Sequence, residues 1–140
     1  MIPDFIVNAL SDKDIVIYGA AETASSYCYI SDTVDALGKL MAGSEPGPVN
    51  IGHPEECKIS EIAQKIIADL KSSAKIVYEK PLPGLQVQGL PDIKKAKETL
   101  GWFPVVTLDQ GLRETVSYIE SARFHYEEKG LWQSDAPGKD

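Results

Sequence analysis

Short apolar segments alternate with amphipathic segments of helical period along most of the chain, and this alternation limits the possible fold more than any other feature. Apolar residues recur at helical spacing in stretches that begin near positions 2, 31, 60, 92 and 107. Runs rich in β-branched and aromatic residues predict strands at 15–18, 27–30, 49–51 and 76–78. Strands that alternate with helices in this way are typical of the α/β class.

Several residues mark the expected ends of these helices. Ser31 and Ser60 are expected N-caps, and Thr107 with Gln110 fits a capping box. Gly101 is expected to end the short helix before it. Trp102 and Phe103, which follow it, are expected to close the core.

Composition excludes some classes of function. The net charge is −7 and no basic stripe is visible, so we expect no nucleic-acid partner. No apolar run approaches the roughly 20 residues of a membrane span, and no signal peptide opens the chain. Cys28 and Cys57 lack metal-ligand spacing. We therefore expect a cytoplasmic protein with two unpaired thiols, no metal site and no membrane contact.

The motifs of dinucleotide chemistry are absent from the sequence. No Gly-x-Gly-x-x-Gly turn is present, so no cofactor-binding residue is predicted. No tyrosine is followed four residues later by a lysine that would lower its pKa, so no catalytic residue is predicted. His53 and His125 each stand alone and are expected at the surface.

The order of the remaining motifs carries a family resemblance. They are Met1-Ile2-Pro3, Ile17-Tyr18-Gly19, the segment 26–32 (SYCYISD), Asn50-Ile51-Gly52, the segment 91–96 (PDIKKA), the segment 100–104 (LGWFP) and the segment 111–116 (GLRETV). In this order and spacing, the chain resembles the C-terminal part of the extended short-chain dehydrogenase/reductase family. Within that family it is most similar to dTDP-glucose 4,6-dehydratases and UDP-glucuronate decarboxylases.

This resemblance implies a fold and a division of labour. The chain would be the C-terminal substrate-binding portion of an extended Rossmann-type enzyme, without the dinucleotide-binding half. Residues 1–126 would form the substrate-binding region of an NAD-dependent epimerase/dehydratase, and residues 127–140 a polar, flexible tail. In the full-length family enzyme, NAD would transiently oxidise the sugar at C4. The chain alone would bind no cofactor and would be inert.

The resemblance also implies seven residues that contact a UDP- or dTDP-sugar. By position in the family motifs they are Ile2, Pro3, Val16, Ile17, Tyr18, Ser25 and Asn50. Ile2, Val16 and Ile17 are equally compatible with a purely structural role in the core.

Two departures from the family pattern weaken the expected binding. Ser25 stands where the family places an arginine that reaches the substrate diphosphate, and the loop 82–90 lacks a second arginine. Losing one partner of a desolvated charge pair costs about 2–5 kcal/mol. Ordinary sugar-nucleotide binding is therefore expected to be impaired. Three alternatives follow: the substrate differs, other groups hold the phosphate, or binding has been lost.

A non-enzymatic alternative stays open at this point. An apolar helix face of Val34, Leu37, Leu40 and Met41 would favour self-association or a protein partner if nothing covers it. The expected partners are thus a second copy of the chain or an N-terminal Rossmann half. Met1 is either a natural start or an internal residue of a longer protein.

Overall fold

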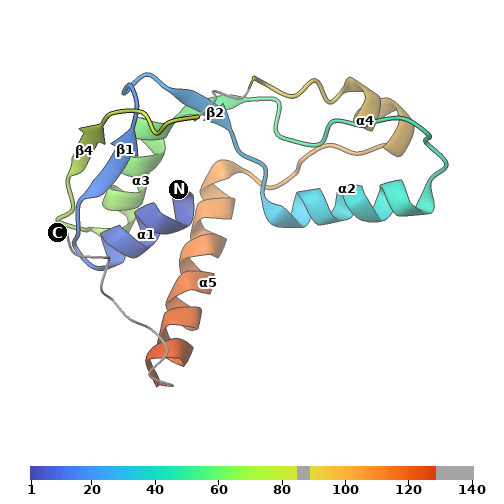
Figure 1. Ribbon diagram of the computed structural model, residues 1–140. Helices are drawn as coiled ribbons and strands as arrows, with labels where there is room; N and C mark the ends of the chain where they lie inside the picture. Colours follow the sequence, from blue (N-terminus) through green and yellow to red (C-terminus); the bar gives the residue numbers. More distant parts are fainter. Residues whose placement is uncertain (85–88, 129–140) are drawn as a thin grey trace.

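Figure 1 shows the computed structural model, which describes residues 1–84 and 89–128. Five helices and four short strands alternate along this part of the chain, and the α/β class is confirmed. In chain order the elements are α1 (Ile2–Leu10), β1 (Ile15–Tyr18), β2 (Ala24–Ser26), α2 (Ile30–Ala42), β3 (Glu56–Lys58), α3 (Ile59–Leu70), β4 (Ile76–Glu79), α4 (Lys94–Leu100) and α5 (Leu108–Glu128).

The strands form two separate pairs among the described residues. β1 and β4 pair in parallel, with Ile15 opposite Ile76. β2 and β3 pair antiparallel, with Ser25 opposite Cys57. Four elements, β2, α2, β3 and α3, lie between β1 and β4 in the sequence, so the parallel pair joins segments that are far apart in the chain.

The larger hydrophobic core joins α1, β1, α3 and α5, which lie together on the left of Figure 1. The expected helical periods hold here, because each of these helices turns its apolar side inward. The buried members are Phe5, Ile6, Ala9, Ile15, Ile17, Ile59, Ile62, Ala63, Ile66, Leu112 and Ile119. The structure therefore confirms the helical patterns that begin near residues 2 and 60. It also confirms the first half of the pattern that begins near residue 107.

A second, smaller core lies between α2 and α4, on the right of Figure 1. Its buried members are Ala36, Ile93, Ala96 and Trp102. Trp102 is 1% exposed, and its indole Nε1–H donates to the Asp32 carbonyl oxygen at 2.9 Å. Trp102 therefore closes a core as expected, whereas Phe103 is 58% exposed and does not.

Asp32 is the one buried charged side chain among the described residues. Its carboxylate Oδ2 accepts hydrogen bonds from the backbone N–H groups of Val105 and Val106, at 3.1 and 3.0 Å. These bonds tie the first turn of α2 to the segment that leads from α4 into α5. The carboxylate thus holds the smaller core next to the start of α5.

Two of the expected strands are wrong. Residues 27–29 are not in a strand, and Ile30 already belongs to α2. Residues 49–51 are also outside any strand, although Val49 and Ile51 pack against the smaller core. β3 was not expected, because its sequence Glu-Cys-Lys carries no apolar run.

The expected helix ends are partly right. Gly101 adopts φ +58° at the C-cap of α4, so this prediction is confirmed. The Gln110 N–H donates to Thr107 Oγ1 at 3.2 Å, which is the N-cap half of the predicted capping box. Ser31 and Ser60 are not N-caps, because α2 begins at Ile30 and α3 at Ile59, so each serine already lies inside its helix.

α5 continues to Glu128, two residues past the expected domain boundary at 126, and residues 129–140 lie outside the described part. The proposed domain division therefore stays a prediction. Within the described residues, no helix has the length and apolar character needed to cross a bilayer.

Candidate functional site

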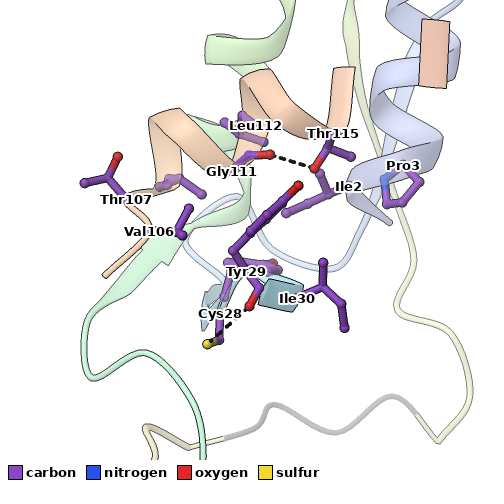
Figure 2. A pocket seen from close by; sticks show the side chains of 12 residues that line it. Ile2, Pro3, Cys28, Tyr29, Ile30, Val106, Thr107, Gly111, Leu112 and Thr115 are labelled. Carbon is purple, nitrogen blue, oxygen red and sulfur yellow. Dashed lines mark hydrogen bonds between the residues drawn. The ribbon is translucent and has the colours of Figure 1, made fainter. Parts of the chain in front are cut away.

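A cavity of about 230 Å³ lies where the two cores meet. Three segments build it: the first turn of α1, the stretch that leads into α2, and the start of α5, as Figure 2 shows. It is lined by Ile2, Pro3, Tyr27, Cys28, Tyr29, Ile30, Val106, Thr107, Leu108, Gly111, Leu112 and Thr115. Elements that are distant in sequence therefore converge on one apolar hollow.

Tyr29 crosses the cavity and its ring packs against α5 at Gly111 (Figure 2). A Cβ atom at position 111 would lie 3.0 Å from Tyr29 Cδ2, which is closer than side chains normally approach. The hydroxyl of Thr115 donates to the Gly111 carbonyl oxygen at 2.6 Å. Glycine at 111 therefore allows the aromatic ring to approach the helix backbone closely.

The lining carries no charged side chain, so the cavity suits an apolar or aromatic group rather than a phosphate. Burial raises the pKa of the Cys28 thiol, while the Thr33 hydroxyl, which donates to Cys28 Sγ at 3.7 Å, opposes this shift. Burial likewise raises the pKa of the Tyr27 phenol. Both groups therefore stay protonated at neutral pH and are not activated for nucleophilic or base chemistry.

Cys57 lies outside the cavity, at β3, and it is also a free thiol with a raised pKa caused first by burial. Within residues 1–84 and 89–128, no group of three His, Cys, Asp or Glu side chains is placed to hold a metal ion. The cavity is therefore a candidate binding site built without reactive side chains.

Of the seven residues proposed as substrate contacts, Ile2 and Pro3 line this cavity. Val16, Ile17 and Tyr18 lie in β1, opposite Val77, Tyr78 and Glu79 of β4. Ile17 is 2% exposed and belongs to the larger core, whereas Tyr18 is 38% exposed at the strand end.

The last two proposed contacts lie in other segments and take part in hydrogen bonds there. Ser25 belongs to β2, and its carbonyl oxygen accepts from Cys57 Sγ at 3.8 Å. Asn50 Nδ2 donates to the Asp92 carbonyl oxygen at 3.2 Å and so ties residues 49–51 to the start of α4. The cavity lining thus includes the first two proposed residues and not the other five.

Sequence reasoning missed most of the cavity wall. Tyr27 and Tyr29 were interpreted as strand residues, and Thr107 only as a helix cap. One sequence feature could have helped: Gly111 lies inside a helical pattern, where glycine is unfavourable unless another group approaches closely.

A second hollow lies between α3 and α5 and has charged walls. Lys65 Nζ is 3.2 Å from Asp69 Oδ2 and 3.3 Å from Asp109 Oδ1. Hydrogen bonding to these two carboxylates raises the pKa of Lys65. Lys65 is thus paired with two carboxylates, and Arg113 lines the same hollow.

Comparison with known proteins connects the chain to enzymes of nucleotide sugars. The family model described as GDP-mannose 4,6 dehydratase matches residues 1–115. UDP-glucuronic acid decarboxylase 1 of Danio rerio is 36% identical over 125 residues, which are 89% of this chain and 30% of that protein. The chain therefore spans about a third of the length of such curated relatives.

Solved structures contain the same fold inside longer chains. UDP-glucose 4-epimerase from Thermotoga maritima, solved with UDP-glucose, has a TM-score of 0.82 and 28% identity over 87% of this chain and 40% of its own. UDP-glucuronic acid 4-epimerase from Bacillus cereus, solved with UDP-glucuronic acid and NAD, has a TM-score of 0.78 and 27% identity over 84% of this chain and 38% of its own. The arrangement of elements in Figure 1 is thus one found in Rossmann-type epimerases.

Proposed function

This chain belongs to the extended short-chain dehydrogenase/reductase family of sugar-nucleotide epimerases and dehydratases, and from this membership we propose that it is a sugar-nucleotide-binding region of such an enzyme. The observation that carries the proposal is the family match over residues 1–115. The Thermotoga and Bacillus structures, solved with UDP-glucose and UDP-glucuronic acid, support a UDP-sugar as the class of ligand.

We place the nucleoside part of the ligand at the cavity between the two cores. Ile2 and Pro3, expected to contact the ligand, lie there beside the ring of Tyr29. An uncharged, aromatic wall favours a planar base over a diphosphate. The diphosphate would lie outside this hollow, toward solvent.

The proposed chemistry needs NAD, which this region does not supply by itself. The family enzymes oxidise the sugar transiently at C4, and the sequence carries neither a Gly-rich dinucleotide turn nor a Tyr-x-x-x-Lys pair. In this proposal a dinucleotide-binding half supplies the hydride acceptor and the base, and the 140-residue chain alone turns over no substrate.

Binding by the chain alone is expected to be weak. Ser25 stands in place of the family arginine. Lys58 forms an ion pair with Glu22, so its charge is already neutralised and is not free to bind the diphosphate. Glu22 also raises the pKa of Lys58 through a hydrogen bond and its charge.

A titration of UDP-glucose and dTDP-glucose into the ¹⁵N-labelled chain, followed by NMR, tests the proposal. We expect a saturable response centred on residues of the cavity wall. Ile2→Asp, which adds a negative charge at the cavity, should abolish the response. Tyr118→Asp makes the same kind of change at a side chain that is 73% exposed on α5 and should leave it intact. No saturable binding, or equal loss in both variants, would contradict the proposed function.

A second candidate function is a diverged module for self-association or protein interaction. We propose a cytoplasmic location for both candidate functions. The observation that favours it is the exposure of Val34, Leu37 and Met41 on α2, at 57%, 51% and 88%. Sedimentation velocity over a range of concentrations distinguishes the two, because a self-associating module changes its mass without any nucleotide sugar.

A further inference from the structure

One long side of β4 carries no partner strand in the described part of the chain. β4 pairs with β1 on its other side, and within residues 1–84 and 89–128 this sheet has no third strand. Figure 1 shows β4 at the outside of the molecule, with β1 on its inner side. An open strand edge of this kind is a template for pairing with another strand. We call this side of Ile76–Glu79 the β4 edge.

The ladder with β1 fixes which backbone groups lie on the β4 edge. The carbonyl oxygens of Lys75 and Glu79 accept from N–H groups at the start of β1 and just past its end, at 2.8 and 2.9 Å. These carbonyls therefore point toward β1. Because alternate residues of a strand direct their N–H and C=O groups to opposite sides, those of Ile76 and Tyr78 point away from β1. Among the described residues, these outward groups form no hydrogen bond.

The side chains of β4 leave this edge accessible. Lys75, Val77 and Glu79 lie on one face of the strand, and Ile76 and Tyr78 lie on the other. Ile76 packs against the larger core, whereas Val77 is 38% and Tyr78 47% exposed. Lys75 and Glu79 are exposed, and in the described chain their side chains form no ion pair. Both charges are therefore available to a neighbouring molecule.

The sequence of β4 is complementary to itself when two copies run antiparallel. In a pairing centred on Val77, Lys75 of each copy lies opposite Glu79 of the other, and Ile76 lies opposite Tyr78. Opposite charges, and a β-branched residue facing an aromatic one, are cross-strand pairs that stabilise a sheet. This charge complementarity indicates a second copy of the chain as the occupant of the β4 edge.

The backbone pattern agrees with the same register. In an antiparallel pair, opposite residues alternate between hydrogen-bonded and non-hydrogen-bonded positions. Ile76 and Tyr78 carry the outward backbone groups, so each Ile76–Tyr78 pair would exchange both of its hydrogen bonds. The Lys75–Glu79 pairs then occupy non-hydrogen-bonded positions, where side chains come closer together.

The neighbouring registers lack these matches. Sliding one copy so that the bonding pattern is kept sets Val77 opposite either Lys75 or Glu79. In both cases neither charge faces an opposite charge on the other strand. The charges therefore favour the register centred on Val77.

We propose that the β4 edge is an interface between two copies of this chain, in which β4 pairs antiparallel with its equivalent and Val77 lies at the two-fold axis. The same surface then serves both copies, as two-fold symmetry requires. The two β1–β4 pairs become one continuous sheet. The interface is separate from the cavity between the two cores and from α2, so the proposal applies to either candidate function.

Sedimentation velocity of the intact 140-residue chain over a range of concentrations tests the proposal. We expect a monomer–dimer equilibrium for the unaltered chain. Lys75→Glu and Glu79→Lys each set like charges opposite one another at both ends of the pairing. Each should therefore weaken the dimer by about tenfold or more.

An equimolar mixture of the two variants is the decisive measurement. In the mixed dimer every acid faces a base, so association should return close to that of the unaltered chain, although each variant alone is weak. A misfolded variant would not be rescued in this way. Lys80→Glu is the matched control, because it makes the same change in net charge at an exposed lysine that faces no charge in this register. It should leave the dimer nearly unaffected.

Amide hydrogen exchange locates the contact within the strand. The N–H groups of Ile76 and Tyr78 should exchange more slowly as the protein concentration rises. The N–H of Val77, which points toward β1, should change little. Protection that does not depend on concentration would contradict pairing between copies.

Several sedimentation results would overturn the proposal. They are a chain that stays monomeric at every concentration, equal weakening by Lys80→Glu, and a mixture that does not recover. Association lost in Leu37→Lys but kept in Lys75→Glu would assign it to the exposed side of α2 instead. Lys75→Glu also serves the sedimentation test of the two candidate functions, because it weakens the β4 contact and leaves α2 unchanged. No nucleotide sugar is present, so the outcome is independent of the ligand titration.

Discussion

At position 111 the absence of a side chain shapes the cavity. The ring of Tyr29 rests against the backbone of α5 there, and an added methyl group would lie 3.0 Å from the ring. Gly38, also inside a helix, has no neighbour within 4 Å of the same methyl position. Two helical glycines in one chain thus have opposite environments, and the difference can be measured.

We expect Gly111→Ala to lower the free energy of unfolding by about 1–3 kcal/mol, because the aromatic ring must shift. Gly38→Ala, the matched control, should raise it by about 0.5–1 kcal/mol through helix propensity alone. Urea unfolding followed by circular dichroism measures both. Equal effects in the two variants would show that Tyr29 gives way without cost.

Asp12 joins the end of α1 to the end of α3. It has φ +52°, and its Oδ1 accepts from the Ser73 N–H at 2.7 Å and from the Ser72 and Ser73 hydroxyls at 3.0 Å. These hydrogen bonds, the backbone one first, lower the pKa of Asp12 below its usual 3.8. Because the folded-state pKa is lower than the unfolded one, the carboxylate stabilises the fold above the unfolded pKa.

This stabilisation should be lost as the pH falls through the folded-state pKa of Asp12. Asp12→Asn keeps a residue that tolerates positive φ but cannot ionise, so its stability should fall less steeply below pH 4 than that of the unaltered chain. Urea midpoints between pH 3 and pH 7 measure the two slopes. Parallel curves would show that Asp12 does not contribute to the acid sensitivity.

Among the elements, helices were predicted well and strands poorly, for a physical reason. Helical periodicity is a local property, so the patterns of α1 and α3 are visible in the sequence. A strand needs a partner, which local sequence does not contain. Tyr27 and Tyr29 use their apolar rings to line a cavity, and Val49 and Ile51 pack on the smaller core without a ladder.

The candidate site shows the same limit at the level of elements. Ile2 and Pro3 could be named from the sequence because a family resemblance points to them. The approach of Tyr29 to Gly111 joins two elements that lie far apart in the chain, and no local pattern reports it. Asp32 likewise looks like an ordinary first-turn acid in the sequence, although its carboxylate is buried.

Removing the Asp32 carboxylate should uncouple α2 from the segment before α5. Asp32→Ala leaves the N–H groups of Val105 and Val106 without their acceptor, so we expect a loss of about 2–3 kcal/mol of stability. Asp35→Ala removes an exposed acid that pairs with Lys39 on the same helix, and it should cost less than about 1 kcal/mol. Thermal unfolding compares the two, and a small effect at position 32 would contradict the role assigned to it.

The whole molecule rests on two cores of unequal size. The larger joins four elements around Ile6, Ile15 and Ile66, and the smaller depends on Trp102 with three short or β-branched neighbours. A core with few large side chains buries little apolar surface, so its local stability is low. The side of α2 that carries the exposed Val34, Leu37 and Met41 lies on this smaller part.

The two cores should therefore unfold separately. Trp102 is a built-in probe of the smaller core, and Trp132→Phe removes the other tryptophan, which lies outside the described residues. In this variant we expect the fluorescence transition of Trp102 at a lower urea concentration than the main helical transition seen by circular dichroism. Coincident transitions would show one cooperative unit instead.

The parallel pairing of β1 with β4 also sets an order of events during synthesis. β1 cannot find its partner until Glu79 has left the ribosome, because the register joins Tyr18 to Glu79. α5, which completes the larger core, is made later still. Chaperones that bind exposed apolar segments of nascent chains would therefore meet α1 and β1 before β4 and α5 cover them.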